Sequence, residues 1–548
     1  MTGTATPTVD EGEAPADHSD RDAATAALSP TPRRDVASLA ERLYPAMPSS
    51  GWRGWLGPVI VMILGGILRF VDLGRPHAIA FDETYYPKEA ISLLRFGYER
   101  TLIEKANNLL LASDGNWHTL PIFKTTPEFV VHPPVGKWTI ALGEYLFGAT
   151  PFGWRFSVAV LGTLSILMVA RIARRLTRSD LIGTLAGFLL ALEGMHLVLS
   201  RTGLLDMVLM FWVLVAFGLL LIDRDRTRKR LATRVSTEGI APLATEWGPR
   251  LGLRPYRWAA AVALGLACGV KWSGVWFLAF FIIMSLVWDV SARRAIGVRR
   301  PWVATLLRDA PLTALTMVVI AVVVYVSTWT GWFMTSGGWD RNWAVTHPPS
   351  IIPAALRSLW HYHAEAWHFH VGLTSGHAYG SNALSWPFMT RPTAFYWESI
   401  KDGTRGCNTN DCAAEVLALA NPIIWWAALA AIIHQLWRWI ARRDWRSGAL
   451  LVGIAAGWIP WLIYLDRTIF TFYVIVYVPF VVMALAMSLG SVLGPANASP
   501  ARRRNGAIAV GAFLLLVVAA AWFFYPIWTG EVIPYQAWRL RMWMPTWT

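Results

Sequence analysis

Long apolar segments alternate with short polar ones along most of the chain. About eleven apolar segments are long enough to cross a bilayer as a helix, because a hydrocarbon core of about 30 Å needs roughly 20 such residues. The expected spans lie near residues 55–71, 155–170, 181–199, 204–222, 256–271, 273–290, 310–330, 422–438, 449–465, 470–489 and 507–525. This pattern predicts an all-α polytopic membrane protein.

Basic clusters occupy alternate connections between the predicted spans. They are RIARRLTR, DRDRTRKR, ARRAIGVRR, RWIARRDWR and ARRR, which begin at Arg171, Asp223, Ala292, Arg438 and Ala501. Short connections rich in Lys and Arg mark the cytoplasmic side of a membrane protein. We therefore expect a multi-pass protein of the cell membrane, with a cytoplasmic N-terminus and an extracytoplasmic C-terminus.

The polar segments divide the chain into a tail and a membrane domain. Residues 1–50 have no apolar run and read as a disordered cytoplasmic tail, not as a secretory signal peptide. Residues 51–548 form one transmembrane catalytic domain with two long external loops, 72–154 and 331–419. The loops are rich in His, Trp and charged residues, so we expect re-entrant or amphipathic segments over an external active site.

Composition supports the membrane assignment and limits the other classes. The chain is 55% hydrophobic and only 15% charged, which is unusual for a soluble protein. Its net charge of +14 lies largely in the basic connections, so nucleic acid is not an expected partner. A disulfide between Cys407 and Cys412 is plausible in an oxidising compartment, whereas Cys268 lies in an apolar segment.

Adjacent acids, Asp82 and Glu83, follow the first predicted membrane exit in the segment FDETYYPKEA. One interpretation is a helix N-cap, since carboxylates there accept free backbone N–H groups. The other is catalytic, because acids near a membrane are costly and usually functional. Neighbouring side chains diverge by about 100°, so the two acids should have separate roles. A sugar transferase with a phosphate leaving group needs one general base.

Cationic side chains recur at the external ends of the predicted spans. Each could reach the interface merely by snorkelling, or pair locally. Together they would form a positively charged ring suited to a lipid-linked phosphate. The four are Arg155, Arg201, Lys271 and Arg467.

The long loop also contains a histidine cluster, for which metal binding is one interpretation and interfacial packing or acceptor contact is the other. Its members are His361, His363, His368, His370 and His377. The sequence has no Gly-rich phosphate loop, which leaves nucleotide donors unsupported. We predict no cofactor and no metal, because Arg and Lys can supply the positive charge for a departing phosphate.

In these motifs the sequence resembles the protein O-mannosyltransferases, which are membrane glycosyltransferases of the GT-C type. The resemblance covers nearly all of the chain after about residue 50, and the Arg-rich composition is like that of an actinobacterial member. Nothing in the long loop is long enough for the MIR domain of eukaryotic members. The matching segments are FDETYYPKEA, HPPVGKW, WRFS, SRTGLLD, GVKWSG, HAYGSNALSWPFMTRP, NPIIWW, RTIFTFYVIVYVP and GEVIPYQAWRLRMWMPTW.

The resemblance implies inverting transfer of mannose from polyprenyl phosphate mannose to Ser or Thr hydroxyls of secreted proteins. It implies that Asp82 is the general base, that Glu83 positions the acceptor or the base, and that Arg155 is required for activity. The residues expected at the donor are Arg201, Lys271, His377, Arg467 and Tyr473.

The resemblance also indicates the partners: the lipid-linked donor, translocating acceptor proteins and, with them, the Sec translocon. One alternative is a related polyprenyl phosphate sugar transferase that acts on a glycolipid or a cell-wall polymer. A transporter is a further alternative, although no internal repeat of the kind common in transporters is visible.

Overall fold

The computed structural model describes residues 33–401, 403–495 and 497–548. Within these residues, eight helices are long and apolar enough to cross a membrane. They are α2 (Arg53–Phe70), α6 (Pro151–Thr177), α9 (Asp206–Glu238), α11 (Gly274–Ala295), α13 (Ala310–Ser327), α16 (Pro422–Arg442), α17 with the following 3-10 turn (Trp445–Ile463) and α19 (Pro500–Thr529). The all-α polytopic class is confirmed.

Three predicted spans have other forms. Helices α7 (Asp180–Ala191) and α8 (Gly194–Ser200) meet at a bend of 64° and count as a ninth span if taken together. The spans predicted near 256–271 and 470–489 coincide with α10 (Pro255–Cys268) and α18 (Val478–Leu493), which have only 14 and 16 residues. The total of about eleven therefore stays a prediction.

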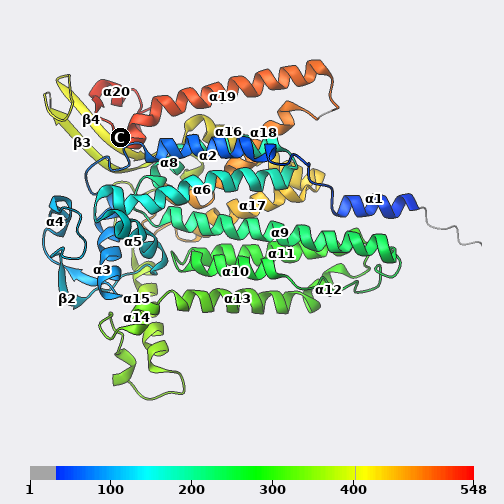
Figure 1. The fold of residues 1–548 in the computed structure, drawn as a ribbon, viewed down its shortest axis with the longest axis horizontal. Helices are drawn as coiled ribbons and strands as arrows, with labels where there is room; N and C mark the ends of the chain where they lie inside the picture. Colours follow the sequence, from blue (N-terminus) through cyan, green and yellow to red (C-terminus); the bar gives the residue numbers. More distant parts are fainter. Residues whose placement is uncertain (1–32, 402, 496) are drawn as a thin grey trace, which may run out of the picture.

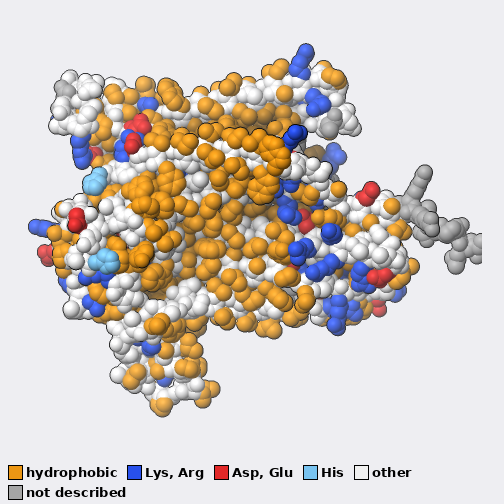
Figure 2. Space-filling view, in the orientation of Figure 1, with side chains coloured by type: hydrophobic (Ala, Val, Ile, Leu, Met, Phe, Trp, Pro, Cys, Tyr) orange, Lys and Arg blue, Asp and Glu red, His pale blue; other side chains and the backbone are white. Residues whose placement is uncertain are grey.

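The long helices lie side by side along the longest axis of the molecule (Figure 1). Apolar side chains cover the middle of the bundle, and Lys and Arg gather at the end where α1 lies (Figure 2). Helix α13 exposes Leu312, Leu315 and Val323, as expected of a helix that faces lipid. The basic connections seen in the sequence therefore gather at one end of the helical bundle.

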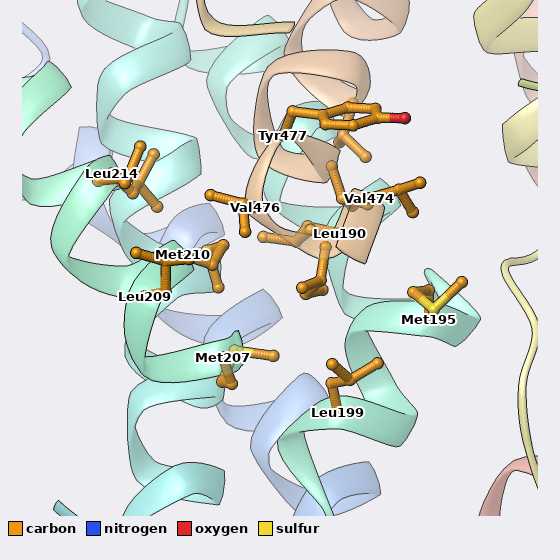
Figure 3. Packing of buried hydrophobic residues seen from close by; sticks show 14 of the residues in the cluster. Leu190, Met195, Leu199, Met207, Leu209, Met210, Leu214, Val474, Val476 and Tyr477 are labelled. Carbon is orange, nitrogen blue, oxygen red and sulfur yellow. The ribbon is translucent and has the colours of Figure 1, made fainter. Parts of the chain in front are cut away.

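The core joins segments that are distant in sequence. Leu190 and Met195 belong to the same buried apolar cluster as Met210 of α9 and as Val474 and Tyr477, which lie before α18 (Figure 3). This cluster holds the bent α7–α8 pair beside the start of α9.

Most of the first long loop, residues 72–154, is folded over one end of the bundle. It contains α3 (Tyr86–Phe96), α4 (Ala106–Ala112) and α5 (Val135–Phe147), with strands β1 (Arg100–Leu102) and β2 (Phe123–Pro127) paired antiparallel. Its helices pack on one another and on α6, so the loop is a fixed part of the fold.

The second loop contains helices α14 (Thr330–Met334) and α15 (Ala354–Gly372) and also a hairpin that the sequence analysis did not predict. Strands β3 (Thr393–Lys401) and β4 (Asp411–Ala418) pair antiparallel, and β5 (Ile533–Pro534) adds to β4. A disulfide joins Cys407 and Cys412 near the turn, and Cys268 is a buried free thiol. Helix α20 (Tyr535–Arg539) follows β5.

Helix α1 (Arg33–Leu43) corrects one part of the predicted tail. Its Leu39 and Leu43 are buried against Leu231 and Val235 of α9, near the connection that carries α12 (Pro301–Arg308). The prediction of disorder is wrong for this segment, because two leucines one turn apart are enough to anchor a short amphipathic helix. Residues 1–32 lie outside the described residues, and their part of the prediction is untested.

Candidate active site

The acidic pair lies on a 3-10 turn, Phe81–Thr84, that leads directly into α3. The turn is anchored by the Phe81 ring, which stacks on Phe395 with 5.2 Å between centroids and meets Phe470 and Phe472 edge-on. Phe81 has a φ of 48°, which a bulky side chain adopts only when its surroundings enforce it. Residues from two other segments, one in β3 and one before α18, therefore fix the position of the acids.

Glu83 and Arg155 form a completely buried ion pair. Arg155 Nε and Nη2 each donate to a Glu83 carboxylate oxygen at 2.7 Å. Glu83 also accepts the backbone N–H groups of Ala80 at 2.9 Å and Gly203 at 2.8 Å. The N-cap interpretation is thus partly correct for Glu83, which binds a backbone amide three residues earlier.

The remaining Arg155 donors bind the backbone of the first loop. Nη1 reaches the carbonyls of Leu73 at 3.3 Å and Pro76 at 3.0 Å, and Nη2 reaches the carbonyl of Ala78 at 3.0 Å. All five guanidinium N–H groups are therefore occupied. In this arrangement Glu83 and Arg155 brace the turn and offer no free group to a substrate, so we classify both as positioning residues.

Asp82 has a different environment from its neighbour. Its carboxylate is half-buried and accepts a long hydrogen bond of 3.4 Å from the Tyr86 hydroxyl. Burial raises the pKa of Asp82 to about 6, and the positive charge of Lys271 opposes that rise while the negative charge of Asp206 adds to it. A carboxylate with a pKa near the working pH is suited to accept a proton.

A cavity of about 540 Å³ contains Lys271 and Asp206, whose charges act on this carboxylate, and is walled by α9, α11, α13, α15 and the segment after α17. Lys271 lies in it, with its Nζ 2.7 Å from the Asp206 carboxylate and 5.4 Å from the centre of the Tyr473 ring. Most of the remaining wall is apolar, and lining residues such as Val275 and Val322 are also exposed on the outer surface of the bundle. The cavity thus combines a cation with an apolar wall that reaches the lipid-facing surface.

Arg467 gives the cavity a second cation. Its Nε donates to the His370 carbonyl at 2.9 Å, and Nη2 lies 3.3 Å from His370 Nδ1. Burial lowers the pKa of His370 to about 4, so its imidazole is neutral and can accept from the guanidinium. Arg467 Nη1 is buried without a partner among the described residues. A buried guanidinium N–H without an acceptor is costly, which indicates a place for an anion.

The structure separates two predicted donor residues from this cavity. Arg201 donates to the backbone carbonyls of Arg69 and Val71 at 2.8 and 2.7 Å and so binds the carbonyl end of α2. His377 contacts the Phe81 ring edge-on, with 5.9 Å between centroids, and neither residue lines the cavity. Lys271, Arg467 and Tyr473 do line it. Arg201 lies at the end of a predicted span, but that position in the sequence does not indicate the direction in which its side chain points.

The other loop histidines are dispersed. His361 pairs with Asp340, His363 contacts Tyr325, and His368 is exposed. The described residues contain no group of three or more His, Cys, Asp or Glu side chains arranged to hold a metal ion. Asp206 was not among the predicted site residues, although an acid at the start of an apolar span was a usable signal.

Together, the helical bundle, a half-buried carboxylate with a raised pKa and a cationic cavity with an apolar wall define a polytopic membrane enzyme for a lipid-borne anionic substrate. Comparison with known proteins places it more narrowly. The family described as dolichyl-phosphate-mannose-protein mannosyltransferase matches residues 59–236, and the C-terminal four TMM region of protein-O-mannosyltransferase matches residues 355–547.

Two curated relatives match over almost their whole length. The chain is 38% identical over 531 residues to the polyprenol-phosphate-mannose--protein mannosyltransferase of Mycobacterium tuberculosis, with 95% of each chain covered. It is 32% identical to the protein of the same name from Corynebacterium glutamicum, covering 94% of this chain and 98% of that one. The chain belongs to the protein O-mannosyltransferase family, which confirms the resemblance noted in the sequence.

A solved structure shares the fold. The Pmt1-Pmt2 complex of S. cerevisiae, bound to the sugar donor, aligns with a TM-score of 0.66 at 14% identity, covering 94% of both chains. This likeness concerns the fold alone, and it supports the GT-C architecture expected from the resemblance.

Proposed function

We propose that this mannosyltransferase moves mannose from polyprenyl phosphate mannose to Ser or Thr hydroxyls of secreted proteins, with inversion at the anomeric carbon. The observation that carries the proposal is that Asp82 lies within electrostatic range of Lys271, which lines a cavity together with Arg467. One group accepts a proton, and two cations face the space where a phosphate would leave. The names of the curated relatives specify the same donor, polyprenol phosphate mannose, and a protein acceptor.

Asp82 acts as the general base in the proposed step. Its carboxylate takes the proton of the acceptor hydroxyl as that oxygen forms a bond to the anomeric carbon of mannose. The bond from the same carbon to the phosphate oxygen breaks, and polyprenyl phosphate leaves with the electron pair. A phosphate is a weak base, so the step needs no general acid.

Lys271 and Arg467 stabilise the phosphate as it leaves. The unpaired Arg467 Nη1 is the donor best placed for a phosphate oxygen, while the Lys271 ammonium adds a second charge-assisted contact. The Tyr473 ring packs under Lys271 and restricts its position. With these cations in place, we propose that the reaction uses no metal or cofactor.

The apolar wall of the cavity supports a lipid donor. Val275 and Val322 line the cavity and are about half exposed on the outer face of the bundle. A polyprenyl chain can therefore lie against this face in the bilayer while its phosphate reaches the cations. A soluble nucleotide sugar has no lipid chain that would lie in such an opening.

We propose that Asp82 faces the extracytoplasmic side, with the N-terminus in the cytoplasm and the C-terminus outside. The positive end of the bundle supports this orientation, because Arg-rich connections remain in the cytoplasm. Acceptor proteins would then reach Asp82 as they leave the membrane, for which the Sec translocon is the expected source.

The decisive experiment incubates membranes that contain the full chain with radiolabelled polyprenyl phosphate mannose and a Ser/Thr-rich secreted peptide. We expect label in the peptide, released by base-catalysed elimination as an O-linked sugar. Label that enters only lipid or wall polymer would support the alternative transferase. Uptake of labelled donor without bond cleavage would support a transporter.

A further inference from the structure

A second cavity, of about 940 Å³, lies between the segment after α1, the end of α6, the middle of α9 and the α16–α17 turn. Its charged lining residues are mainly basic: Arg42, Arg178, Arg224, Arg438, Arg442, Arg446 and Asp444. A concave site with six arginines and one acid among its lining residues concentrates positive potential, which favours an anionic occupant.

Arg224 gives this cavity a buried arginine whose hydrogen bonds are not satisfied within the described part of the chain. Its side chain is 7% exposed, yet it donates no hydrogen bond within the described part of the chain, and its Nε is buried without a partner. The nearest carboxylate oxygen, on Asp225, is 3.6 Å from Nη1, beyond good hydrogen-bond distance. Asp225 instead accepts a bond of 2.7 Å from Arg175.

The Arg224 guanidinium is also held in a fixed plane. Its Cζ lies 3.2 Å from the centre of the Trp445 ring and 5.8 Å from that of Trp288. Stacking restricts the guanidinium without using its N–H groups, so they remain directed and available. This is the arrangement expected of a donor prepared for a phosphate.

The acid in the lining does not neutralise the site. Asp444 accepts hydrogen bonds from Arg438 at 2.6 Å and from Arg446 at 2.8 Å, so its charge is already shared by two arginines. Arg442 is exposed beside the Trp437 ring. Positive charge therefore remains on Arg224 and Arg442 after the internal pairing.

The surroundings favour a lipid over a soluble anion. Trp437 lines the cavity, and the neighbouring Ile433 and Ile440 of α16 are 69% and 67% exposed on the lipid-facing surface. Arg224 follows Asp206 by eighteen residues on α9, a rise of about 27 Å. Since a hydrocarbon core is about 30 Å thick, the two cavities lie near opposite surfaces of the membrane.

We propose that this cavity binds the phosphate headgroup of an anionic membrane lipid, with Arg224 as its central donor and the acyl chains along α16. Basic pockets between membrane helices recognise such headgroups through phosphate contacts. The site is separate from the Asp82 cavity, and its existence does not depend on the proposed function.

The test measures phosphatidylglycerol binding to the purified full chain in detergent by native mass spectrometry, with phosphatidylcholine of the same acyl chains as the comparison. We expect wild type to retain phosphatidylglycerol preferentially. Arg224→Gln should weaken phosphatidylglycerol binding by roughly tenfold, which corresponds to the loss of one charge-assisted hydrogen bond. Arg442→Gln, at a more exposed position, should weaken this binding by a similar factor. Arg504→Gln removes an exposed arginine on α19 outside the cavity and should leave binding within about twofold.

A parallel measurement identifies the source of the phosphate. The measurement is the thermal unfolding temperature with and without glycerol phosphate. If glycerol phosphate raises this temperature for wild type but not for Arg224→Gln, and no lipid is retained preferentially, the result would support a phosphate site and overturn its assignment to a lipid. Equal retention of both lipids, with no effect of glycerol phosphate, would overturn the site. Unchanged phosphatidylglycerol binding in Arg442→Gln and in a folded Arg224→Gln protein would do the same.

Discussion

Arg155 and Glu83 are joined by two hydrogen bonds of 2.7 Å between completely buried groups. Because Arg155 also holds three backbone carbonyls of the first loop, this pair fixes the turn on which Asp82 lies. The acids adjacent in sequence therefore have opposite surroundings. Glu83 is fully paired in the interior, whereas Asp82 is half-buried and accepts one long hydrogen bond, from the Tyr86 hydroxyl.

Breaking that pair should first affect stability. Arg155→Met or Glu83→Gln leaves an unpaired buried partner, and we expect a loss of about 3–5 kcal/mol, measured by thermal or denaturant unfolding in detergent. The double variant should lose less than the sum of the two single losses. Glu398→Gln is the matched control, since its ion pair with Arg405 is exposed and should contribute less than about 1 kcal/mol. Normal stability of both single variants would contradict the bracing role.

Asp82→Asn tests the base directly. The amide has nearly the same size but cannot accept a proton, so turnover should fall by roughly 10²–10⁴-fold while unfolding temperature and donor affinity stay close to wild type. Single-turnover transfer from labelled donor to peptide measures the chemical step. Near-normal turnover would remove Asp82 from that role.

The pH profile should report the same carboxylate. Since burial raises the pKa of Asp82 to about 6, the group is protonated and inactive as a base below that pH. The rate at saturating donor should therefore fall about tenfold per pH unit below about 6 and level off above it.

Neighbouring charges should move that profile in opposite directions. Lys271→Met removes the positive charge that lowers the pKa of Asp82, so the profile should shift to higher pH. Asp206→Asn removes a negative charge that raises the pKa, so the profile should shift to lower pH. The readout is the shape of the pH–rate curve, because both variants will also lower the maximal rate. Shifts of the same sign would contradict the assignment.

Arg467→Gln should act on the donor more than on folding. It removes the unpaired Nη1 of a residue that lines the cavity, and we expect the donor KM to rise by roughly tenfold to a hundredfold, the value of one or two bonds to a charged phosphate. Arg405→Gln, on the exposed hairpin, is the control for loss of charge alone. An unchanged KM with reduced stability would instead assign Arg467 a structural role.

Orientation can be tested with single cysteines and a membrane-impermeant maleimide on intact cells. The native thiols give a low background, because Cys268 is buried and the other two form a disulfide. Thr119→Cys in the first loop should be labelled from outside, whereas Arg299→Cys, exposed between α11 and α12, should react only after lysis. The reverse pattern would place Asp82 in the cytoplasm and exclude an external donor site.

The sequence by itself determined the membrane bundle, its charge polarity and the candidate base. Long apolar segments and basic connections report how each segment partitions between lipid and water, a local property that does not depend on distant residues. The unusual position of Asp82 after a membrane exit was visible for the same reason. So were Lys271 and Arg467 at the ends of predicted spans.

Only the tertiary structure decided which charges meet. Glu83 pairs with an arginine 72 positions later, Arg201 turns to backbone carbonyls instead of the cavity, and Asp206 joins Lys271 across 65 positions. Such pairings depend on how helices pack, because a side chain's position along a span fixes its depth but not its direction around the helix. The β3–β4 hairpin and helix α1 were missed for a related reason, since neighbouring segments stabilise them more than their own pattern indicates.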